Sequence, residues 1–407
     1  MRSCGVFRLQ QELVQFLEDF ASKKSVFKNK KVFQPSYKPA TILHRNDLIE
    51  QMAKILAPVL KLEKPSNLFV YGKTGTGKTL SVKDVAEGFN KLVISKNIPL
   101  KILYINCKLK RISDTEYRLI AQLAREFGKT IPPTGLPTDE VYKLFFNAVD
   151  ESERAVILVL DEVDQLTKKT GSELLYNLTR INEELSKSFV SLIGISNDLN
   201  FVDALDPRVK SSLSEEELLF PPYNAVQIQE ILNERAKEGF AKNKIGQGVI
   251  EKCSAYAARE HGDARRALEL LRVSGELADR SNNQKVTTEH VDEAEEKIDR
   301  DRLLDAVSTQ PKQAQAALYS IISTSSGKQP IFTGTVYEFY KELCTRTDLR
   351  PLTQRRLSDI ISELDMLGVI TARVISKGRY GRTREIVVPK TLQAANIRRI
   401  LQDALNL

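Results

Sequence analysis

Residues Gly72 to Thr79 read GKTGTGKT, which is the spacing of a phosphate-binding loop. An apolar run precedes them and an amphipathic stretch follows, so a strand and a helix should flank the loop. Glycines let backbone amides turn toward phosphates, and the helix N-terminus adds a positive dipole end. This chemistry suits a nucleotide with several phosphate groups. The residues expected to contact it here are Gly72, Thr74, Gly75, Thr76, Gly77, Lys78, Thr79 and Leu80.

Two acidic residues, Asp161 and Glu162, end the apolar run Val156–Leu160 further along the chain. Taken alone, such a run is usually a strand that meets solvent. After a phosphate-binding loop, the pair predicts a hydrolytic site in which Thr79 and Asp161 hold Mg²⁺. Lys78 should reach the β- and γ-phosphates. Glu162 is placed to orient or deprotonate the attacking water.

Three further polar residues could complete such a site, and each has a second interpretation. Asn197 follows the apolar run Val190–Ile195 and could bind the γ-phosphate or the water, or could form an Asx turn. Arg265 opens a predicted helix and could close over the phosphates, or could be surface charge. Arg208 could serve a neighbouring subunit's nucleotide as an arginine finger, or could pair with acids. The residue types leave these alternatives open.

The first half of the chain alternates short apolar runs with helical patterns, which predicts βαβ units and a parallel sheet covered on both faces. The expected helices include Ser81–Ile94 and Ser172–Leu185. After residue 223 the strand signal ends, and helices such as Ala225–Phe240 and Ala264–Ala278 predict a small helical domain. The runs expected to be strands are Asn67–Tyr71, Ile102–Ile105, Val156–Leu160 and Val190–Ile195.

These patterns divide the chain into four parts and give an α/β fold class. We expect an N-terminal extension (1–30), a nucleotide-binding base domain (31–224), a helical lid domain (225–300) and a C-terminal domain (301–407). The extension ends in a loose basic run that could be a solvated linker or a nucleic-acid contact. Its lysines are Lys23, Lys24, Lys28, Lys30 and Lys31.

The C-terminal domain has the pattern of a winged helix: three helices, at about 311–323, 333–345 and 353–367, and then strands at 369–376 and 383–388. Such a domain binds DNA or, in other cases, protein. Polar and basic residues at the start of the third helix suit the major groove, and a basic hairpin suits the DNA backbone or minor groove. The expected DNA-binding residues are Thr353, Gln354, Arg355, Arg356, Arg373, Lys377, Arg379, Tyr380, Arg382 and Arg384.

Charge and composition agree with a polyanionic partner without requiring one. The 407 residues carry a net charge of +8, and residues 301–407 hold 16 Lys+Arg against 10 Asp+Glu, which is +6. A basic surface without a nucleic-acid partner would give the same count. The four cysteines are scattered and lack CxxC spacing, so we expect neither a disulfide framework nor a zinc site. With no apolar run of about 18 residues, we expect no membrane span and a cytoplasmic protein.

Together, the motifs resemble those of the AAA+ ATPases: Walker A (72–79), Walker B (158–162), sensor 1 (Asn197), an arginine-finger region (Arg208) and sensor 2 (262–267). Three further stretches resemble the archaeal replication initiators, which are related to the largest subunit of the eukaryotic origin recognition complex and to its helicase-loading paralogue. These stretches are VFQPSYKPATILHR (32–45), FPPYNAVQIQEILNERA (220–236) and PLTQRRLSDIISELDMLGVI (351–370).

The resemblance implies that Tyr223 and Arg235 contact the nucleotide and that residues 108–150 contain a helical insertion that contacts DNA. It further implies binding of ATP or ADP with Mg²⁺, slow ATPase activity used as a switch, and a place on double-stranded origin DNA in the nucleoid. Implied partners are the hexameric replicative helicase and other initiator copies. One departure is the box Leu43-His44-Arg45-Asn46, which in the family reads Pro-His-Arg-Glu.

Two other classes share parts of this architecture. A P-loop transcription regulator also joins an ATPase, a helical lid and a winged helix, but its lid usually contacts the nucleotide through GxP, whereas this chain has FPPY (220–223) and an arginine-bearing sensor 2. A clamp-loader-type ATPase lacks a basic C-terminal winged helix. We therefore expect an initiator.

Overall fold

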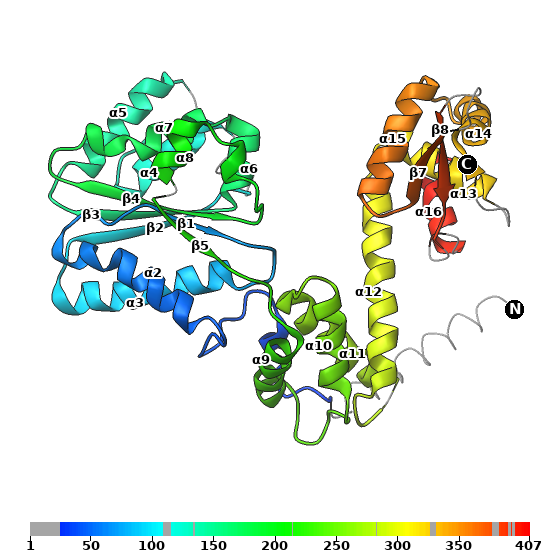
Figure 1. Cartoon of the computed structure of the whole chain (residues 1–407), viewed down its shortest axis with the longest axis horizontal. Coiled ribbons are helices and arrows are strands. Elements are labelled where there is room, and N and C mark those ends of the chain that lie inside the picture. Colours follow the sequence, from blue (N-terminus) through cyan, green and yellow to red (C-terminus); the bar gives the residue numbers. More distant parts are fainter. Residues whose placement is uncertain are drawn as a thin grey trace, which may run out of the picture. The chain divides into compact units, whose positions relative to one another are not determined.

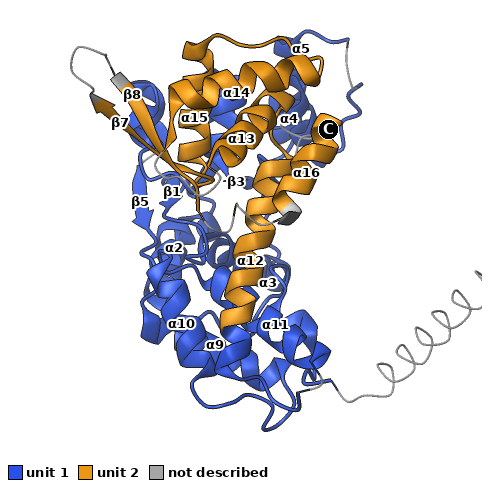
Figure 2. Cartoon of the chain, turned by 90° about the vertical axis from the view of Figure 1, so that its right-hand side faces the viewer, with its two compact units in different colours: residues 1–291 blue, residues 292–407 orange. Residues whose placement is uncertain are grey.

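The computed structural model describes residues 25–108, 115–132, 135–213, 215–281, 283–325, 331–376, 382–389, 392 and 395–407. The chain forms two compact units, residues 1–291 and 292–407 (Figures 1 and 2). Helix α12 (Thr288–Ser308) crosses the boundary between them.

Unit 1 contains a five-stranded parallel sheet in the order β2-β3-β4-β1-β5. Its interior strand β3 is buried at every residue, as expected for a continuous apolar run covered on both faces. The parallel sheet predicted from the sequence is therefore present. The strands are β1 (Leu68–Tyr71), β2 (Leu100–Asn106), β3 (Ala155–Asp161), β4 (Phe189–Ser196) and β5 (Glu216–Leu219).

Helices cover both faces of this sheet (Figure 1). Alternate residues of β3 enter different cores: Ile157 and Val159 pack with α2 and α3, whereas Leu158 and Leu160 pack with α4 to α8. The covering helices are α2 (Asn46–Leu56), α3 (Lys78–Lys96), α4 (Glu116–Glu126), α5 (Thr138–Val149), α6 (Val163–Thr170), α7 (Glu173–Thr179) and α8 (Pro207–Leu213).

Two details of this domain differ from the sequence-based expectations. The helix expected over Ser172–Leu185 ends at Thr179, and a 3-10 turn follows because the Asn182 side chain bonds both backbone groups of Val190 at 2.8 Å. Strand β5 was not predicted. Its sequence, EELL, lacks an apolar pattern because an edge strand is exposed along most of its length.

The lid consists of α9 (Ala225–Gly239), α10 (Val249–Arg259) and α11 (Ala264–Arg280). Asn224 and Gln227 form a capping box at the start of α9. The segment before the base domain packs on this lid. Phe27 stacks on Phe240 with ring centroids 4.7 Å apart, and Lys30 pairs with Glu276 at 2.6 Å. Residues 25–33 are therefore anchored on the lid rather than forming a free linker, although Lys28, Lys30 and Lys31 are exposed; Lys23 and Lys24 lie outside the described residues.

Unit 2 contains a three-stranded antiparallel sheet in the order β6-β8-β7 and a helical core. The stripe formed by Leu357, Ile360, Ile361 and Leu364 of α15 is buried, as predicted. Helices and strands therefore form the expected winged-helix arrangement. They are α13 (Lys312–Thr324), β6 (Ile331–Phe332), α14 (Thr333–Arg346), α15 (Gln354–Met366), β7 (Thr371–Ser376), β8 (Arg382–Val387) and α16 (Ala395–Leu405).

Among the described residues, none of the helices is both long enough and apolar enough to cross a membrane.

Candidate nucleotide-binding and DNA-binding sites

The phosphate-binding loop has a backbone that only glycine accommodates at key points. Gly72, Gly75 and Gly77 all have positive φ angles, of 154°, 71° and 92°. A Cβ atom on Gly75 would lie 1.7 Å from Oδ1 of Asp263, and one on Gly72 would lie 2.4 Å from the carbonyl oxygen of Phe220. The loop therefore passes close to both the lid and the end of β5, and its glycines permit that approach.

Lys78 is buried at the start of α3 and has no acidic partner within bonding distance among the described residues. Its Nζ donates to the carbonyl oxygens of Gly72, at 2.8 Å, and Lys73, at 2.7 Å. Burial and then the nearby positive charge of Arg265 lower the pKa of Lys78 to about 8. Because the Lys78 ammonium group is bound by loop carbonyls, a phosphate that enters the loop would supply the negative charge to balance it.

The hydroxyl and carboxylate predicted to hold a cation lie together. Thr79 Oγ1 donates to Asp161 Oδ2 at 3.0 Å, and the backbone N–H of Glu162 donates to Asp161 Oδ1 at 3.0 Å. Tyr104 from β2 also donates its hydroxyl to Asp161 Oδ2; burial, and then this bond, raise the pKa of Tyr104. Hard oxygen donors beside a phosphate-binding loop fit Mg²⁺.

The residues proposed for catalysis follow adjacent strands β3 and β4, at the same edge of the sheet. Glu162 has a left-handed backbone conformation, with φ 57°, and its Oε2 lies 3.9 Å from Lys108 Nζ. Asn197 is exposed directly after β4. The buried Asp164, which sequence analysis did not single out, accepts a bond from Ser196 Oγ at 3.3 Å and so joins the two strand ends.

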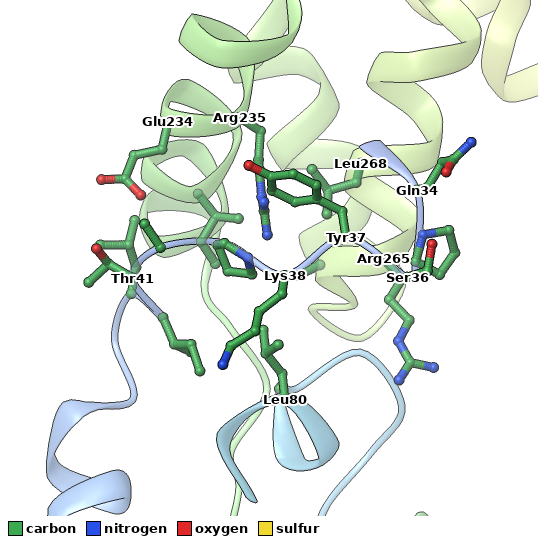
Figure 3. Close-up of a pocket in the computed structure, with 18 of the residues that line it drawn as sticks. Gln34, Ser36, Tyr37, Lys38, Thr41, Leu80, Glu234, Arg235, Arg265 and Leu268 are labelled. Carbon is green, nitrogen blue, oxygen red and sulfur yellow. The ribbon is translucent and has the colours of Figure 1, made fainter. Parts of the chain in front are cut away.

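A cavity of about 530 Å³ adjoins the loop between the base and the lid. Figure 3 shows side chains of the segment 34–41, α3, α9 and α11 around it. Its volume suits a ligand of nucleotide size. The lining includes Gly75, Gly77, Thr79, Leu80, Tyr223, Arg235 and Arg265 from the predicted set, and Gln34, Tyr37, Lys38, Thr41, Lys83 and Glu234 from outside it.

Arg235 is the most informative residue of this cavity. Its side chain is 8% exposed, and its guanidinium lies 4.7 Å from the centre of the Tyr37 ring. Its buried Nη1 has no hydrogen-bond partner among the described residues. A buried donor without a partner is costly, so a ligand acceptor in the cavity would satisfy it. Tyr37 is itself tied to the lid, because its hydroxyl donates to Glu238 Oε2 at 2.6 Å.

Arg45, which lies in the divergent box Leu43–Asn46, connects the loop to the hinge before the lid. It is 3% exposed, donates to Thr76 O at 2.9 Å and to Pro221 O at 2.5 Å, and lies 3.8 Å from the Tyr223 ring centroid. From the sequence, this box was only a departure from the family pattern. The role of Arg45 has no local sequence pattern, because its hydrogen-bond acceptors Thr76 and Pro221 lie far from it along the chain.

The two remaining arginines have different surroundings. Arg265 is exposed in the first turn of α11 and lines the cavity. Arg208 lies outside the cavity lining and forms a two-point pair with Asp206, at 3.1 and 3.0 Å, which lowers the pKa of Asp206 to about 2. In this single chain, Arg208 therefore pairs with an acid.

In unit 2, a groove of about 440 Å³ lies between α15 and the β7–β8 hairpin. It gathers Gln354, Arg355 and Arg384 from the predicted DNA-binding set. Thr353 caps α15 by accepting a bond from Arg356 N at 3.3 Å, and Arg373 and Arg356 are exposed. Lys377, Arg379 and Tyr380 lie outside the described residues, and of Arg382 only the backbone in β8 is described.

The predicted insertion between β2 and β3 contains helices α4 and α5, which pack together in the core of the base domain. Residues 109–114 and 133–134 of this segment lie outside the described part. Contact of residues 108–150 with DNA stays a prediction.

Three family models match successive parts of the chain. They describe an AAA domain (residues 62–201), a Cdc6 AAA+ ATPase-type lid domain (229–296) and a CDC6 C-terminal winged-helix domain (305–393). The three parts of the predicted fold class are confirmed in the predicted order. The exact domain boundaries stay predictions.

The chain is also similar to proteins over almost its whole length. It is 53% identical to the ORC1-type DNA replication protein of Pyrococcus abyssi, over 93% of this chain and 90% of the relative. Identity with ORC1-type DNA replication protein 1 of Methanosarcina mazei is 50%, over 97% and 94%.

Two solved structures of this kind of protein are also similar to the chain. The ORC1 protein of Aeropyrum pernix, solved in complex with DNA, has a TM-score of 0.81 and 44% identity, covering 94% of this chain and 97% of that one. Cdc6p of Pyrobaculum aerophilum, with a TM-score of 0.59 and 21% identity, shares the fold. The chain therefore belongs to the Cdc6/ORC1-type family of AAA+ DNA replication proteins, as the sequence resemblance predicted.

Proposed function

We propose that the protein is an ATP-regulated replication initiator that binds double-stranded origin DNA through its winged helix and helps to recruit the hexameric replicative helicase. The observation that carries this proposal is the pairing, on one chain, of a phosphate-binding loop at which Thr79 meets Asp161 with a winged helix whose groove gathers Arg355 and Arg384. The DNA complex of the 44% identical Aeropyrum pernix protein supports the DNA-binding part.

In this proposal, unit 1 binds ATP or ADP in the cavity beside the loop. The backbone amides of residues 72–80 and the Lys78 ammonium would bind the phosphates, and Tyr223 and Arg235 would contact the rest of the nucleotide. Thr79 and Asp161 would hold Mg²⁺. When bound, Mg²⁺ neutralises phosphate charge and stabilises the charge that develops during phosphoryl transfer.

Hydrolysis would use the residues at the carboxyl edge of the sheet. Glu162 would orient or deprotonate the water, Asn197 would bind the water or the γ-phosphate, and Arg265 would stabilise charge on the γ-phosphate. Arg208 would have to exchange Asp206 for the nucleotide of a second initiator copy. We expect slow turnover, because the nucleotide state acts as a switch between conformations.

On the DNA side, Thr353, Gln354, Arg355 and Arg356 would present donors to the major groove. The basic hairpin, with Arg373, Lys377, Arg379, Tyr380, Arg382 and Arg384, would contact the backbone or minor groove. Residues 108–150 would add a second contact from the base domain. With these roles, we propose that the protein acts in the cytoplasm, in association with the nucleoid.

Footprinting on genomic DNA fragments, with ATP, ADP or neither, tests the biological assignment. We expect protection confined to replication origins. Protection at promoters would instead support the transcription-regulator alternative, and absence of any protection would favour a clamp-loader-type role. Co-purification of the replicative helicase with the DNA-bound protein would test the recruitment step, which fails if helicase retention is the same on DNA without the protein.

A paired substitution tests the groove itself. Arg355→Ala with Arg384→Ala should weaken DNA binding, and loss of the proposed Arg384 contact with the backbone should reduce the slope of log affinity against log salt by about 0.9. Arg346→Ala with Arg399→Ala removes the same charge from exposed positions of unit 2 outside the groove lining. Equal changes in both double variants would remove the groove from the DNA interface.

A further inference from the structure

Tyr104 combines a partly exposed ring with a hydroxyl that reaches the buried carboxylate of Asp161. It lies on the edge strand β2, and its side chain is 37% exposed, whereas its partner Asp161 is 4% exposed. In the sheet register, Tyr104 pairs with Val159, so Asp161 lies two residues further along β3 on the same face. A tyrosine is long enough to span this diagonal, and its hydroxyl donates to Asp161 Oδ2.

This bond acts together with two others to fix the Asp161 carboxylate. Oδ2 accepts from both Thr79 Oγ1 and the Tyr104 hydroxyl, and Oδ1 accepts from the backbone N–H of Glu162. An ionised carboxylate offers about four acceptor positions on its two oxygens. With three filled, the carboxylate is held at both oxygens, and the remaining acceptor position belongs to Oδ1.

The ring of Tyr104 is held from the other side. Lys83, one turn after Thr79 on α3, places its Nζ 4.3 Å from the centre of the ring. Lys83 also lines the nucleotide cavity. Tyr104 therefore contacts a cavity-lining lysine through its ring and the predicted cation-binding carboxylate through its hydroxyl. Substitution of Tyr104 by phenylalanine would remove the hydrogen bond to Asp161 and keep the ring that contacts Lys83.

We propose that Tyr104 is a positioning residue for the divalent-cation site. Its hydroxyl holds the Asp161 carboxylate in the orientation that also meets Thr79, so that the pair is preorganised before a cation arrives. The inference rests on the proposed binding of nucleotide with Mg²⁺. Groups that orient a metal ligand without touching the metal commonly change metal affinity by about 10-fold or more when removed.

The test measures cation affinity rather than turnover. Affinity for a fluorescent ADP analogue is titrated in EDTA and then against free Mg²⁺, for the wild type, Tyr104→Phe and a matched control, Tyr142→Phe. Tyr142 also donates its hydroxyl to a carboxylate, Glu116 Oε1, at 2.6 Å, in the same domain but outside the cavity lining. Thermal unfolding of each nucleotide-free protein accompanies the titration.

We expect Tyr104→Phe to bind the analogue in EDTA as the wild type does, and to need about 10-fold more free Mg²⁺ for half of the Mg²⁺-dependent gain in affinity. Tyr142→Phe should keep the wild-type Mg²⁺ requirement. Identical Mg²⁺ curves for Tyr104→Phe and wild type would overturn the inference and leave the proposed function intact. An equal shift in Tyr142→Phe would overturn it too, because loosened packing would then explain both. A wild type that binds no nucleotide would overturn the proposed function itself.

Discussion

The two ends of the nucleotide cavity are built in different ways. At the phosphate end, one continuous segment supplies the glycines, Lys78 and Thr79, and its backbone has positive φ angles at Gly72, Gly75 and Gly77, with the Phe220 carbonyl close to Gly72. At the other end, segments far apart in the sequence meet. The Arg235 guanidinium lies over the Tyr37 ring, and Lys38 forms an exposed ion pair with Asp84 at 3.3 Å. The phosphate end should therefore supply most of the nucleotide affinity, whereas the other end should make smaller changes to the affinity and to the rate of nucleotide release.

The largest expected effect is that of Lys78→Ala. Loss of the buried ammonium should weaken ATP and ADP binding by about 100-fold or more, since charge-assisted bonds to phosphate each contribute roughly 1.5–3 kcal/mol. Equilibrium titration of a fluorescent nucleotide measures this. Lys73→Ala is the matched control, because Lys73 lies in the same loop but is exposed. Unchanged affinity in Lys78→Ala would contradict the assignment of the loop.

Glu162→Gln should separate binding from turnover at the phosphate end. The isosteric amide keeps the shape of the side chain but cannot act as a base, so the hydrolysis rate should fall by about 100-fold while nucleotide affinity stays within about threefold of wild type. Single-turnover hydrolysis and the same titration measure the two quantities. Retained hydrolysis would remove Glu162 from its proposed role.

Arg235→Ala tests the other end of the cavity. It removes a buried donor and the contact with Tyr37, and should weaken nucleotide binding by about 10-fold, less than Lys78→Ala. Arg259→Ala is the control, since Arg259 lies over another lid tyrosine, with its guanidinium 5.1 Å from the Tyr256 ring centroid. If both variants bind nucleotide as the wild type does, the cavity is not the nucleotide site.

The smallest effect is expected for Lys38→Ala. Its ion pairs with Asp84 and Glu87 are solvent-exposed, so they contribute little, and affinity should change by no more than about threefold. Stopped-flow measurement should show somewhat faster nucleotide release, with the difference fading at high salt. A loss as large as that of Lys78→Ala would contradict the contrast between the two ends.

The same contrast explains what the sequence could predict. The loop, the acids after β3 and the stripe on α15 were predicted because each is a pattern within one short segment. Arg45 could not be assigned a role, because its partner Pro221 lies 176 residues away. Tyr37 and Lys38 were missed for the same reason: no local pattern distinguishes a cavity-lining segment from a linker.

Two other misses have physical causes. Tyr104 follows the ordinary alternation of a strand, and only the register with β3 places its hydroxyl at Asp161. The lysines Lys28 to Lys31 suggested solvated chain, but the neighbouring aromatic Phe27 packs against Phe240 and anchors the segment on the lid. The parallel sheet, by contrast, followed from short apolar runs that alternate with helical patterns, which is typical of βαβ units.

We propose that nucleotide bound by unit 1 changes the affinity of the chain for DNA. The most direct measurement is the affinity for an origin fragment, at one salt concentration, with ATP, with ADP and without nucleotide, for the wild type and Lys78→Ala. We predict that nucleotide changes the wild-type affinity by at least about fivefold, a typical coupling, and leaves Lys78→Ala unchanged. Identical wild-type affinities in all three conditions would contradict the account.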